Sequence, residues 1–412
     1  MRRMGFQERL ISLMMMCVTT VSYSMLINGE PKCKIAPTRG LRQGDPISSY
    51  LFLLCAEGLS AMLRRDEFGE NPRGISACRG APRVSHLLFA DDCIVFCKAS
   101  TEEGLKVTKI LDNYEREFGK KLNREKTSLF FSKNMKVEVQ EAVKDMFGAQ
   151  IILQHEKYLG LPPLVGRGKK KAFNRIKDQV GRKIASWKGK LLSPASREIL
   201  IKALAQATPA YTMNYFKIPN SLCSELNSLI YNFWWGQRDK ERKLAWIAWE
   251  NMCKPKADEG MGFKDLRAFN LALLAKQGWT LIQNPGSLTH RVLKAKYFPE
   301  SNFMEAQIGK KPLYTWRSLM EGINVLDRGL RWSIGNGQSV RIWGDRWLPT
   351  QNSFKVTNPR PQVFEGNTVD SLLDREGGGW DKNLMCSVFL PYEVDTILSI
   401  PISNTFPEDA LA

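Results

Sequence analysis

The sequence contains only three histidines, and none of its nine cysteines lies in a Cys-x-x-Cys pair. The cysteines are scattered singly and are not grouped with the histidines, which are His86, His155 and His290. This scatter argues against a zinc site and against a disulfide framework. A reducing compartment fits such cysteines better than secretion does. The sequence also lacks a repeat of fixed period, so a repeat architecture is not expected.

One uncharged stretch, from Leu10 to Ile27, resembles a signal sequence or a short membrane span. However, serines and threonines interrupt it, and its second half is rich in strand-forming residues. That half ends at Asn28-Gly29, a pair typical of tight turns. We therefore expect a helix followed by a core strand and no membrane partner, with the membrane segment as the alternative.

Charge is abundant but uneven. The chain of 412 residues is 43% hydrophobic and 25% charged, as in ordinary globular proteins, and its net charge is +18. Residues 351–412 carry a local charge of −5, so residues 1–350 carry +23. A strongly basic region favours a polyanionic partner, with nucleic acid first among the candidates. A solvated basic face without such a partner is the alternative.

The first third of the chain predicts an α+β fold. Residues 45–65 predict a helix, because Asp45 can cap it, Pro46 suits its first position and apolar residues recur at helical spacing. Residues 84–97 predict a hairpin, and residues 101–118 a second helix. A return strand is expected from Lys126 to Phe131. This alternation of helices and strands is typical of an α+β layout.

The rest of the chain is expected to be mostly helical, in three further parts after a first domain of residues 1–160. Residues 161–290 predict a basic helical region, with helices near 197–207, 222–234 and 266–282. Residues 291–350 are rich in tryptophan, and a hairpin around Asn336-Gly337 is expected between Trp332 and Trp343. Residues 351–412 predict an acidic linker and tail.

Two adjacent carboxylates, Asp91 and Asp92, interrupt an apolar run. Burying a charge costs several kcal/mol of folding free energy unless the charge is paired or bound to metal. Carboxylate oxygens are the ligands that Mg²⁺ prefers, and two metals about 3.5–4 Å apart support nucleotidyl transfer. The pair therefore indicates a divalent-metal site at a hairpin tip. A solvated Asp-Asp turn is the alternative.

A second dense motif, Arg39-Gly40-Leu41-Arg42-Gln43-Gly44-Asp45-Pro46, precedes the predicted helix. Glycines permit close approach of a ligand, and backbone N–H groups at a helix N-terminus attract phosphate. The segment therefore suggests a nucleotide contact, with a plain capped loop as the alternative.

Together, Phe89-Ala90-Asp91-Asp92 and the segment 39–46 resemble the palm of reverse transcriptases from plant LINE-type non-LTR retrotransposons. The resemblance covers about residues 1–350 and implies a partial polymerase palm followed by a helical thumb and connector. It makes Asp91 a catalytic metal ligand and Asp92 its less demanding neighbour. The site of the incoming nucleotide and template base is then lined by Arg39, Gly40, Arg42, Gln43, Gly44, Asp45 and Pro46.

Weaker matches follow the same family. Lys126 lies in a segment similar to the next motif, and the resemblance makes it a catalytic lysine near the triphosphate that could protonate the pyrophosphate leaving group. A surface lysine is an equal alternative. Tyr158, Leu159 and Gly160 resemble the turn that grips the primer end. Basic residues beyond it are expected to contact phosphates of the primer–template duplex, namely Arg167, Lys169, Lys170, Lys171, Arg175 and Lys183.

The family pattern also requires another aspartate, on a strand before the segment 39–46. The only acids before Asp45 are Glu8 and Glu30, and neither has that strand context. We therefore expect part of an RNA-directed DNA polymerase with an incomplete two-metal Mg²⁺ site. Its partners by resemblance are an RNA template, a DNA primer and deoxynucleoside triphosphates, and the sequence indicates no obligate protein partner. The resemblance also implies an intracellular ribonucleoprotein, nuclear or cytoplasmic, that is not secreted. The alternatives are a non-catalytic, nucleic-acid-binding relic and an intron maturase.

Overall fold

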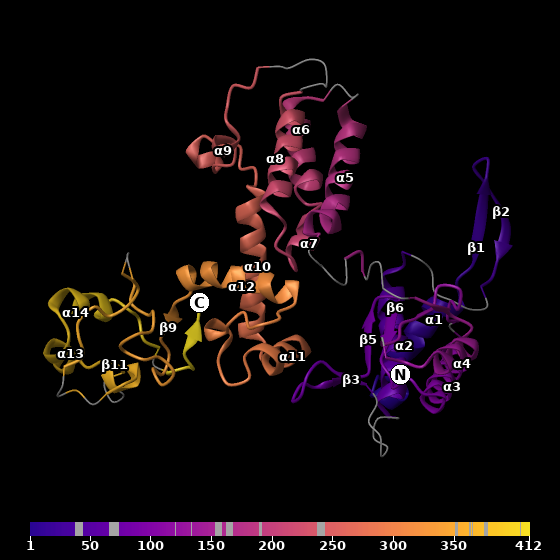
Figure 1. Ribbon diagram of the computed structural model, residues 1–412, viewed down its shortest axis with the longest axis horizontal. Coiled ribbons are helices and arrows are strands. Elements are labelled where there is room, and N and C mark those ends of the chain that lie inside the picture. Colours follow the sequence, from indigo (N-terminus) through magenta and orange to yellow (C-terminus); the bar gives the residue numbers. More distant parts are fainter. Residues whose placement is uncertain are drawn as a thin grey trace. The chain divides into compact units, whose positions relative to one another are not determined.

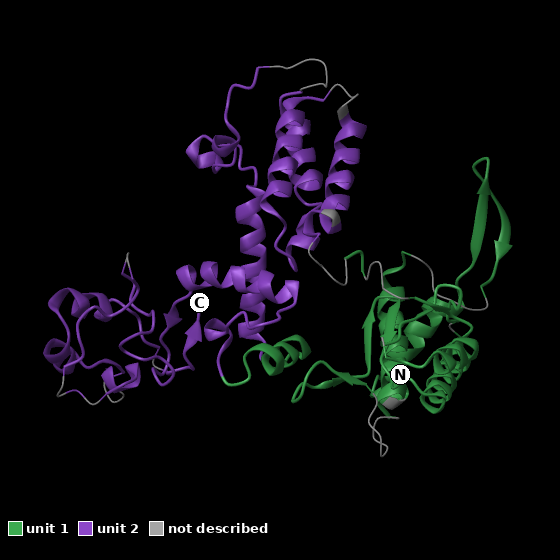
Figure 2. Ribbon diagram, viewed as in Figure 1, with its two compact units in different colours: residues 1–164, 286–300 green, residues 165–285, 301–412 purple. Residues whose placement is uncertain are grey.

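The computed structural model describes most of the chain in two compact units (Figures 1 and 2). Unit 1 comprises residues 1–164 and 286–300, and unit 2 comprises residues 165–285 and 301–412. The described residues are all those outside 38–43, 66–73, 120, 133, 153–158, 162–167, 189–191, 237–243, 351–352, 362–363, 365, 375–377 and 404.

Unit 1 combines helices with small two-stranded sheets, in agreement with the α+β expectation. Its helices are η1 (Arg2–Met4), α1 (Glu8–Thr19), α2 (Pro46–Arg65), α3 (Thr101–Phe118), α4 (Val137–Phe147) and α11 (Leu288–Tyr297). Its strands are β1 (Tyr23–Ile27), β2 (Glu30–Ile35), β3 (Ile75–Ser76), β4 (Arg83–Val84), β5 (His86–Phe89), β6 (Asp92–Val95), β7 (Ser128–Leu129) and β8 (Gln150–Ile151). The strands form four separate pairs: β1–β2, β3–β4 and β5–β6 are antiparallel, and β7–β8 is parallel.

Helix α2 begins where its capping residues predict. The backbone N–H of Ile47 donates to Oδ1 of Asp45 at 3.0 Å, which satisfies one of the free N–H groups of the first turn. The buried face of α2 contributes Leu59 and Leu63 to a core shared with Tyr114 of α3. Among the described helices, α2 is the one that is long and apolar enough to span a membrane by length and composition.

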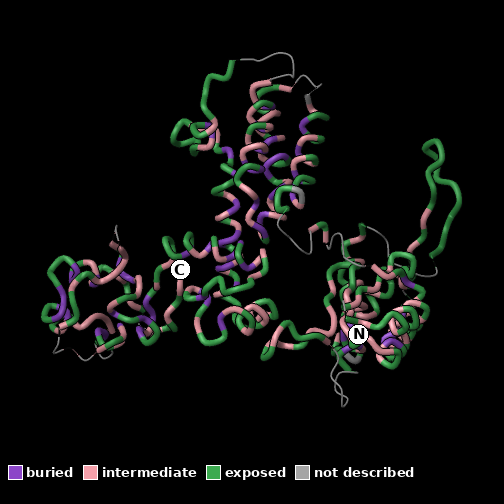
Figure 3. The backbone as a smooth tube through the Cα atoms, in the orientation of Figure 1, coloured by how far each residue is buried: buried purple, intermediate pink, exposed green. Residues whose placement is uncertain are grey.

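The β1–β2 hairpin corrects one expectation. Helix, strand and turn follow one another as predicted, but β1 is not a core strand: Met25, Leu26 and Ile27 are 56%, 74% and 47% exposed (Figure 3). Every residue of β1 after Tyr23 is exposed, so neither face of this strand is covered by the described residues. The expected return strand at 126–131 is also reduced, to the two residues of β7.

Unit 2 is mainly helical. Its helices are α5 (Lys169–Lys188), α6 (Pro194–Leu200), the π-helix η3 (Ile201–Ala205), α7 (Ala210–Met213), α8 (Asn220–Trp234), α9 (Trp249–Met252), η4 (Lys256–Asp258), α10 (Leu266–Gln283), η5 (Phe303–Glu305), α12 (Tyr314–Gly329), η6 (Val369–Leu372), α13 (Lys382–Val388) and α14 (Pro391–Leu398). Its short strands are β9 (Trp332–Ser333), β10 (Leu373–Asp374), β11 (Gly379–Trp380) and β12 (Ala410–Leu411).

Helices α5 and α8 lie side by side (Figure 1). Helix α5 buries Phe173, Ile176, Val180 and Ile184, whose spacing of three and four residues forms one face. Beside this face, Glu225 of α8 accepts hydrogen bonds from two lysines of α5. The lysines are Lys170 and Lys177, each 2.6 Å from a carboxylate oxygen.

The ion pairs of Glu225 give unit 2 a predicted response to acid. Hydrogen bonds from Lys170 and Lys177 lower the pKa of Glu225 from 4.5 to about 2. A lowered pKa stabilises the folded state above pH 4.5, and this contribution is lost as the pH falls towards 2. We expect the melting temperature of Glu225→Gln to depend less on pH across this interval than that of the unmodified chain. Parallel pH profiles of the two proteins in thermal melts would contradict this expectation.

The C-terminal part of unit 2 has a core of its own. Fully buried residues on both sides of position 350, such as Val340, Val369 and Met385, belong to one cluster. The sequence suggested a linker and tail from residue 351, because prolines, asparagines and acids obscure the apolar residues among them. In the structure those apolar residues pack together instead.

The hairpin expected around Asn336-Gly337 does not form, although residues 332–343 are all described. Strand β9 pairs instead with β12, at the far end of the chain. The loop N–H groups are held by the carboxylate of Asp409, which lies next to β12. Asp409 accepts bonds of 2.8, 2.9 and 2.8 Å from the N–H groups of Gly335, Gly337 and Ser339. A distant partner therefore satisfies the backbone that a local hairpin would have paired.

Candidate functional site

The acidic pair lies at the tip of the β5–β6 hairpin. Phe89 pairs with Asp92 in the antiparallel register, so Ala90 and Asp91 form the turn. Ala90 has a φ of 49°, the left-handed conformation that a two-residue turn requires at its first position. Both aspartates are exposed to solvent. The apolar neighbours in sequence therefore do not bury the two carboxylates.

The base of this hairpin is fixed in the core of unit 1. Leu88 of β5 and Val95 of β6 pack against the cluster formed by α2 and α3. His86 adds polar contacts, with Nε2 2.9 Å from Oγ of Ser60 and Nδ1 2.9 Å from Oγ of Ser85. The two helices thus hold the strands, while the turn that carries the carboxylates faces water.

The oxygen atoms that the hairpin tip presents are of the type that a hard divalent cation binds. Carboxylate oxygens are typical Mg²⁺ ligands, and Mg²⁺ usually completes its shell with water and substrate phosphates. Within the described residues, however, no group of three or more histidine, cysteine or acidic side chains is close enough to hold a metal. Asp91 and Asp92 are the two carboxylates that the tip of this hairpin exposes to solvent.

The nucleotide-contact segment is only partly described. Arg39, Gly40, Arg42 and Gln43 lie outside the described residues. Gly44 has a φ of 86°, which favours glycine, and it leads into Asp45 and Pro46 at the start of α2. The capped helix start that the sequence predicts is therefore present, next to residues whose placement is not described.

The two weaker matches to the family, Lys126 and the segment 158–160, are also only partly described. Lys126 is exposed, and its backbone N–H donates to Oδ1 of Asn123 at 3.2 Å, which closes a turn before β7. Tyr158 lies outside the described residues, whereas Leu159 and Gly160 form a turn with φ values of 50° and 77°. A turn is thus present where the primer-gripping segment was expected.

The basic residues of α5 differ in whether their side chains contact other groups of the protein. Lys170 is paired with Glu225, and Lys169 lies 4.8 Å from the ring centre of Tyr314. Lys183 donates to the neutral Oγ1 of Thr208 at 3.0 Å. Arg175 is exposed and has no partner within the described residues. Arg167 and the side chain of Lys171 lie outside the described part.

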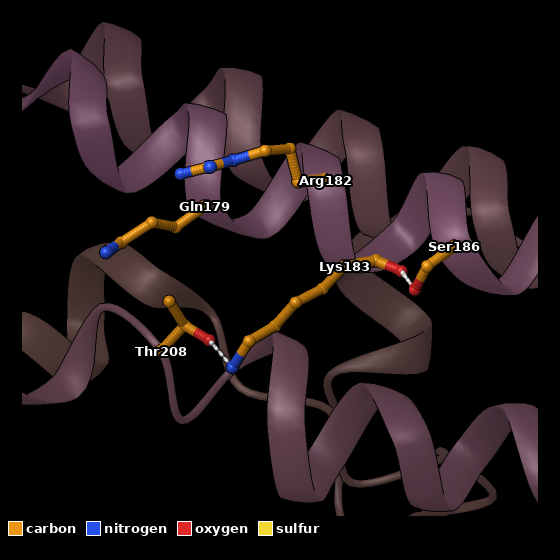
Figure 4. A pocket seen from close by; sticks show the side chains of 5 residues that line it. All are labelled: Gln179, Arg182, Lys183, Ser186 and Thr208. Carbon is orange, nitrogen blue, oxygen red and sulfur yellow. Dashed lines mark hydrogen bonds between the residues drawn. The ribbon is translucent and has the colours of Figure 1, made fainter.

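Sequence reasoning missed Arg182 and three neutral side chains near Lys183. Gln179, Ser186 and Thr208 line an open pocket together with Arg182 and Lys183 (Figure 4). Spacing along the helix could have grouped Gln179 and Ser186 with the two cations. Thr208 lies beyond the next helix, and no pattern in the sequence connects it to α5.

Comparison with known proteins identifies the segment that carries the acidic hairpin. Residues 1–162 match the family model described as reverse transcriptase (RNA-dependent DNA polymerase). Residues 1–162 of this chain belong to the reverse transcriptase family. An uncharacterized mitochondrial protein of Arabidopsis thaliana is 44% identical over 153 residues, which are 37% of this chain and 99% of that protein.

Two further relatives are similar to parts of this chain, and the name of one of them refers to a retrotransposable element. A putative ribonuclease H protein of Arabidopsis thaliana is 31% identical over 54% of this chain and 36% of its own length. The retrovirus-related Pol polyprotein from type-1 retrotransposable element R2 of Nasonia vitripennis is 40% identical over 18% of this chain and 6% of its own length. These relatives agree with a plant non-LTR retrotransposon reverse transcriptase. The chain spans about a third or less of the length of both.

Proposed function

We propose that this chain is the primer–template-binding part of an RNA-directed DNA polymerase from a plant LINE-type retrotransposon. Residues 1–160 form part of the palm, and the helices that follow serve as thumb and connector. The observation that carries this proposal is the solvent-exposed Asp91-Asp92 tip inside the segment that matches the reverse transcriptase family.

In this proposal Asp91 is the main metal ligand and Asp92 its neighbour. Bound Mg²⁺ would stabilise charge on the oxygens that react in nucleotidyl transfer. Lys126 would lie near the triphosphate, residues 39–46 near the nucleotide and template base, and residues 158–160 at the primer end. The family pattern places a further aspartate on a strand before the segment 39–46, where the acids of this chain are Glu8 and Glu30.

Nucleic-acid binding is the part of the function that this chain should perform alone. We expect tight binding of an RNA–DNA hybrid at low salt, measured by fluorescence anisotropy. The logarithm of the association constant should fall with the logarithm of salt concentration, with a slope of roughly −3 to −4 for three or four phosphate contacts. Asp91→Asn should leave this slope unchanged, because the slope depends on cationic side chains that neutralise phosphates, and Asp91 is an acid. No binding at low salt would contradict the proposal.

A non-catalytic, nucleic-acid-binding relic is the second candidate, and the basic helix α5 favours it. The two candidates make the same prediction for hybrid binding. They differ in whether activity returns when the missing carboxylate is supplied, as described in the Discussion.

A further inference from the structure

Helix α5 carries an open pocket of about 570 Å³ on the side of the helix that faces the turn after η3. Four of its lining residues come from α5, and Thr208 comes from that turn (Figure 4). Three of them follow Gln179 at helical spacing: Arg182 after three residues, Lys183 after four and Ser186 after seven. This spacing aligns their side chains along one stripe of the helix.

Hydrogen bonds hold the pocket in place. Thr208 Oγ1 donates to the carbonyl oxygen of Leu204 at 2.6 Å and accepts from Nζ of Lys183 at 3.0 Å. Ser186 Oγ donates to the carbonyl oxygen of Lys183 at 2.6 Å. Figure 4 shows the Lys183 ammonium directed at Thr208, with Gln179 and Arg182 along the same wall. The ammonium is therefore fixed in position by a neutral group.

The side chains that line the pocket carry two positive charges, on Arg182 and Lys183. None of the five described side chains that line it is a carboxylate. Arg182 makes one long contact of 3.4 Å, to the backbone carbonyl of Asp178, and no ion pair within the described residues. Lys170 and Lys177, on the same helix, differ in this respect because both form ion pairs with the carboxylate of Glu225. Unlike Lys170 and Lys177, Arg182 and Lys183 of the pocket thus have no carboxylate partner within the described residues.

We propose that this pocket binds one phosphate group of the nucleic-acid backbone. The inference rests on the proposed function and adds where on α5 the backbone is held. A guanidinium can bind phosphate with two parallel hydrogen bonds, and the adjacent ammonium adds a second charge. Gln179 has no partner within the described residues, so its amide N–H groups are free to donate as well. The ligand class is a phosphate diester.

The test compares the affinity of the full chain for an RNA–DNA hybrid with that of single charge-removing variants. Arg182→Gln and Lys183→Gln should each weaken binding about threefold to tenfold at low salt and reduce the salt slope by about 1. Lys177→Gln removes the same charge from the same helix but from a pair with Glu225, and should change neither quantity by as much. Circular dichroism melts confirm that each variant is folded.

Three results would overturn the inference, and they are distinguishable. Equal losses for Lys177→Gln and Lys183→Gln would mean that the helix acts only through its overall charge. Hybrid binding that is unchanged in Arg182→Gln and Lys183→Gln would overturn the pocket but leave the proposed function standing. No hybrid binding by the unmodified chain would overturn both.

A free phosphate is the other possible source of the same chemistry. Isothermal titration with inorganic phosphate and with a deoxynucleoside triphosphate tests it directly. Saturable binding of either ligand that Arg182→Gln abolishes, with unchanged hybrid affinity, would assign the pocket to a free phosphate instead. Competition of millimolar phosphate with the hybrid, lost in the same variant, supports the backbone-phosphate site.

Discussion

The purified chain is expected to give no measurable Mg²⁺-dependent extension of an oligo(dT) primer on a poly(rA) template. Two-metal catalysis depends on carboxylates that hold both ions, and removal of such electrostatic stabilisation costs several orders of magnitude in rate. The two acids that precede the segment 39–46 form ion pairs with neighbouring basic residues. Glu8 lies 2.7 Å from the Arg2 guanidinium, and Glu30 lies on the exposed β2 at 3.5 Å from Lys32.

A longer polypeptide that includes an aspartate-bearing strand of the same family before residue 1 provides the control. Extension should appear with it and should be lost again in its Asp91→Asn variant, in assays that follow incorporation of labelled dTTP. Lys144→Gln, on the exposed side of α4, serves as a matched surface control that keeps activity. Robust extension by the 412-residue chain alone would contradict the incomplete site. A longer polypeptide that binds hybrid but never extends it would favour the non-catalytic relic.

Gly322→Ala is expected to destabilise unit 2 by about 1–3 kcal/mol, because there is no room for a side chain at this position. Helices α10 and α12 pack closely there, and a Cβ at position 322 would lie 2.6 Å from the backbone N of Ala275. It would also lie 2.8 Å from the backbone carbon of Leu274. Backbone atoms inside a helix cannot move aside as the end of a flexible side chain can.

The matched control is Gly181→Ala, within α5, where an added Cβ meets nothing within 4 Å. Alanine is a better helix former than glycine by about 1 kcal/mol, so this variant should be neutral or slightly more stable. Urea unfolding followed by circular dichroism measures both effects. Equal midpoints for the two variants would show that the α10–α12 contact tolerates an added methyl group.

Local signals predicted the elements that depend on neighbours in sequence. Asp45 and Pro46 placed the start of α2, and α3 has the predicted bounds of 101–118. The acidic hairpin forms where two apolar runs flank a two-residue turn. In each case the capping group or the turn lies within a few residues of the element that it defines.

Distant partners explain where the predictions fail. The Asn336-Gly337 turn was expected to close a hairpin, but the carboxylate of Asp409 binds the loop and β12 pairs with β9. The segment after residue 350 was expected to be a linker, but Val369 and Met385 complete a core with residues before it. Composition within a short window carries no information about such partners.

The sequence by itself determined the family, the acidic pair at 91–92 and the excess of positive charge on residues 169–188. Only the tertiary structure decided which of those charges are available. Glu225, on α8, shares its one negative charge between Lys170 and Lys177, whereas Lys183 meets the uncharged hydroxyl of Thr208. The physical reason is that a charge is cancelled by what lies within a few ångströms of it, and here those partners come from other helices and turns.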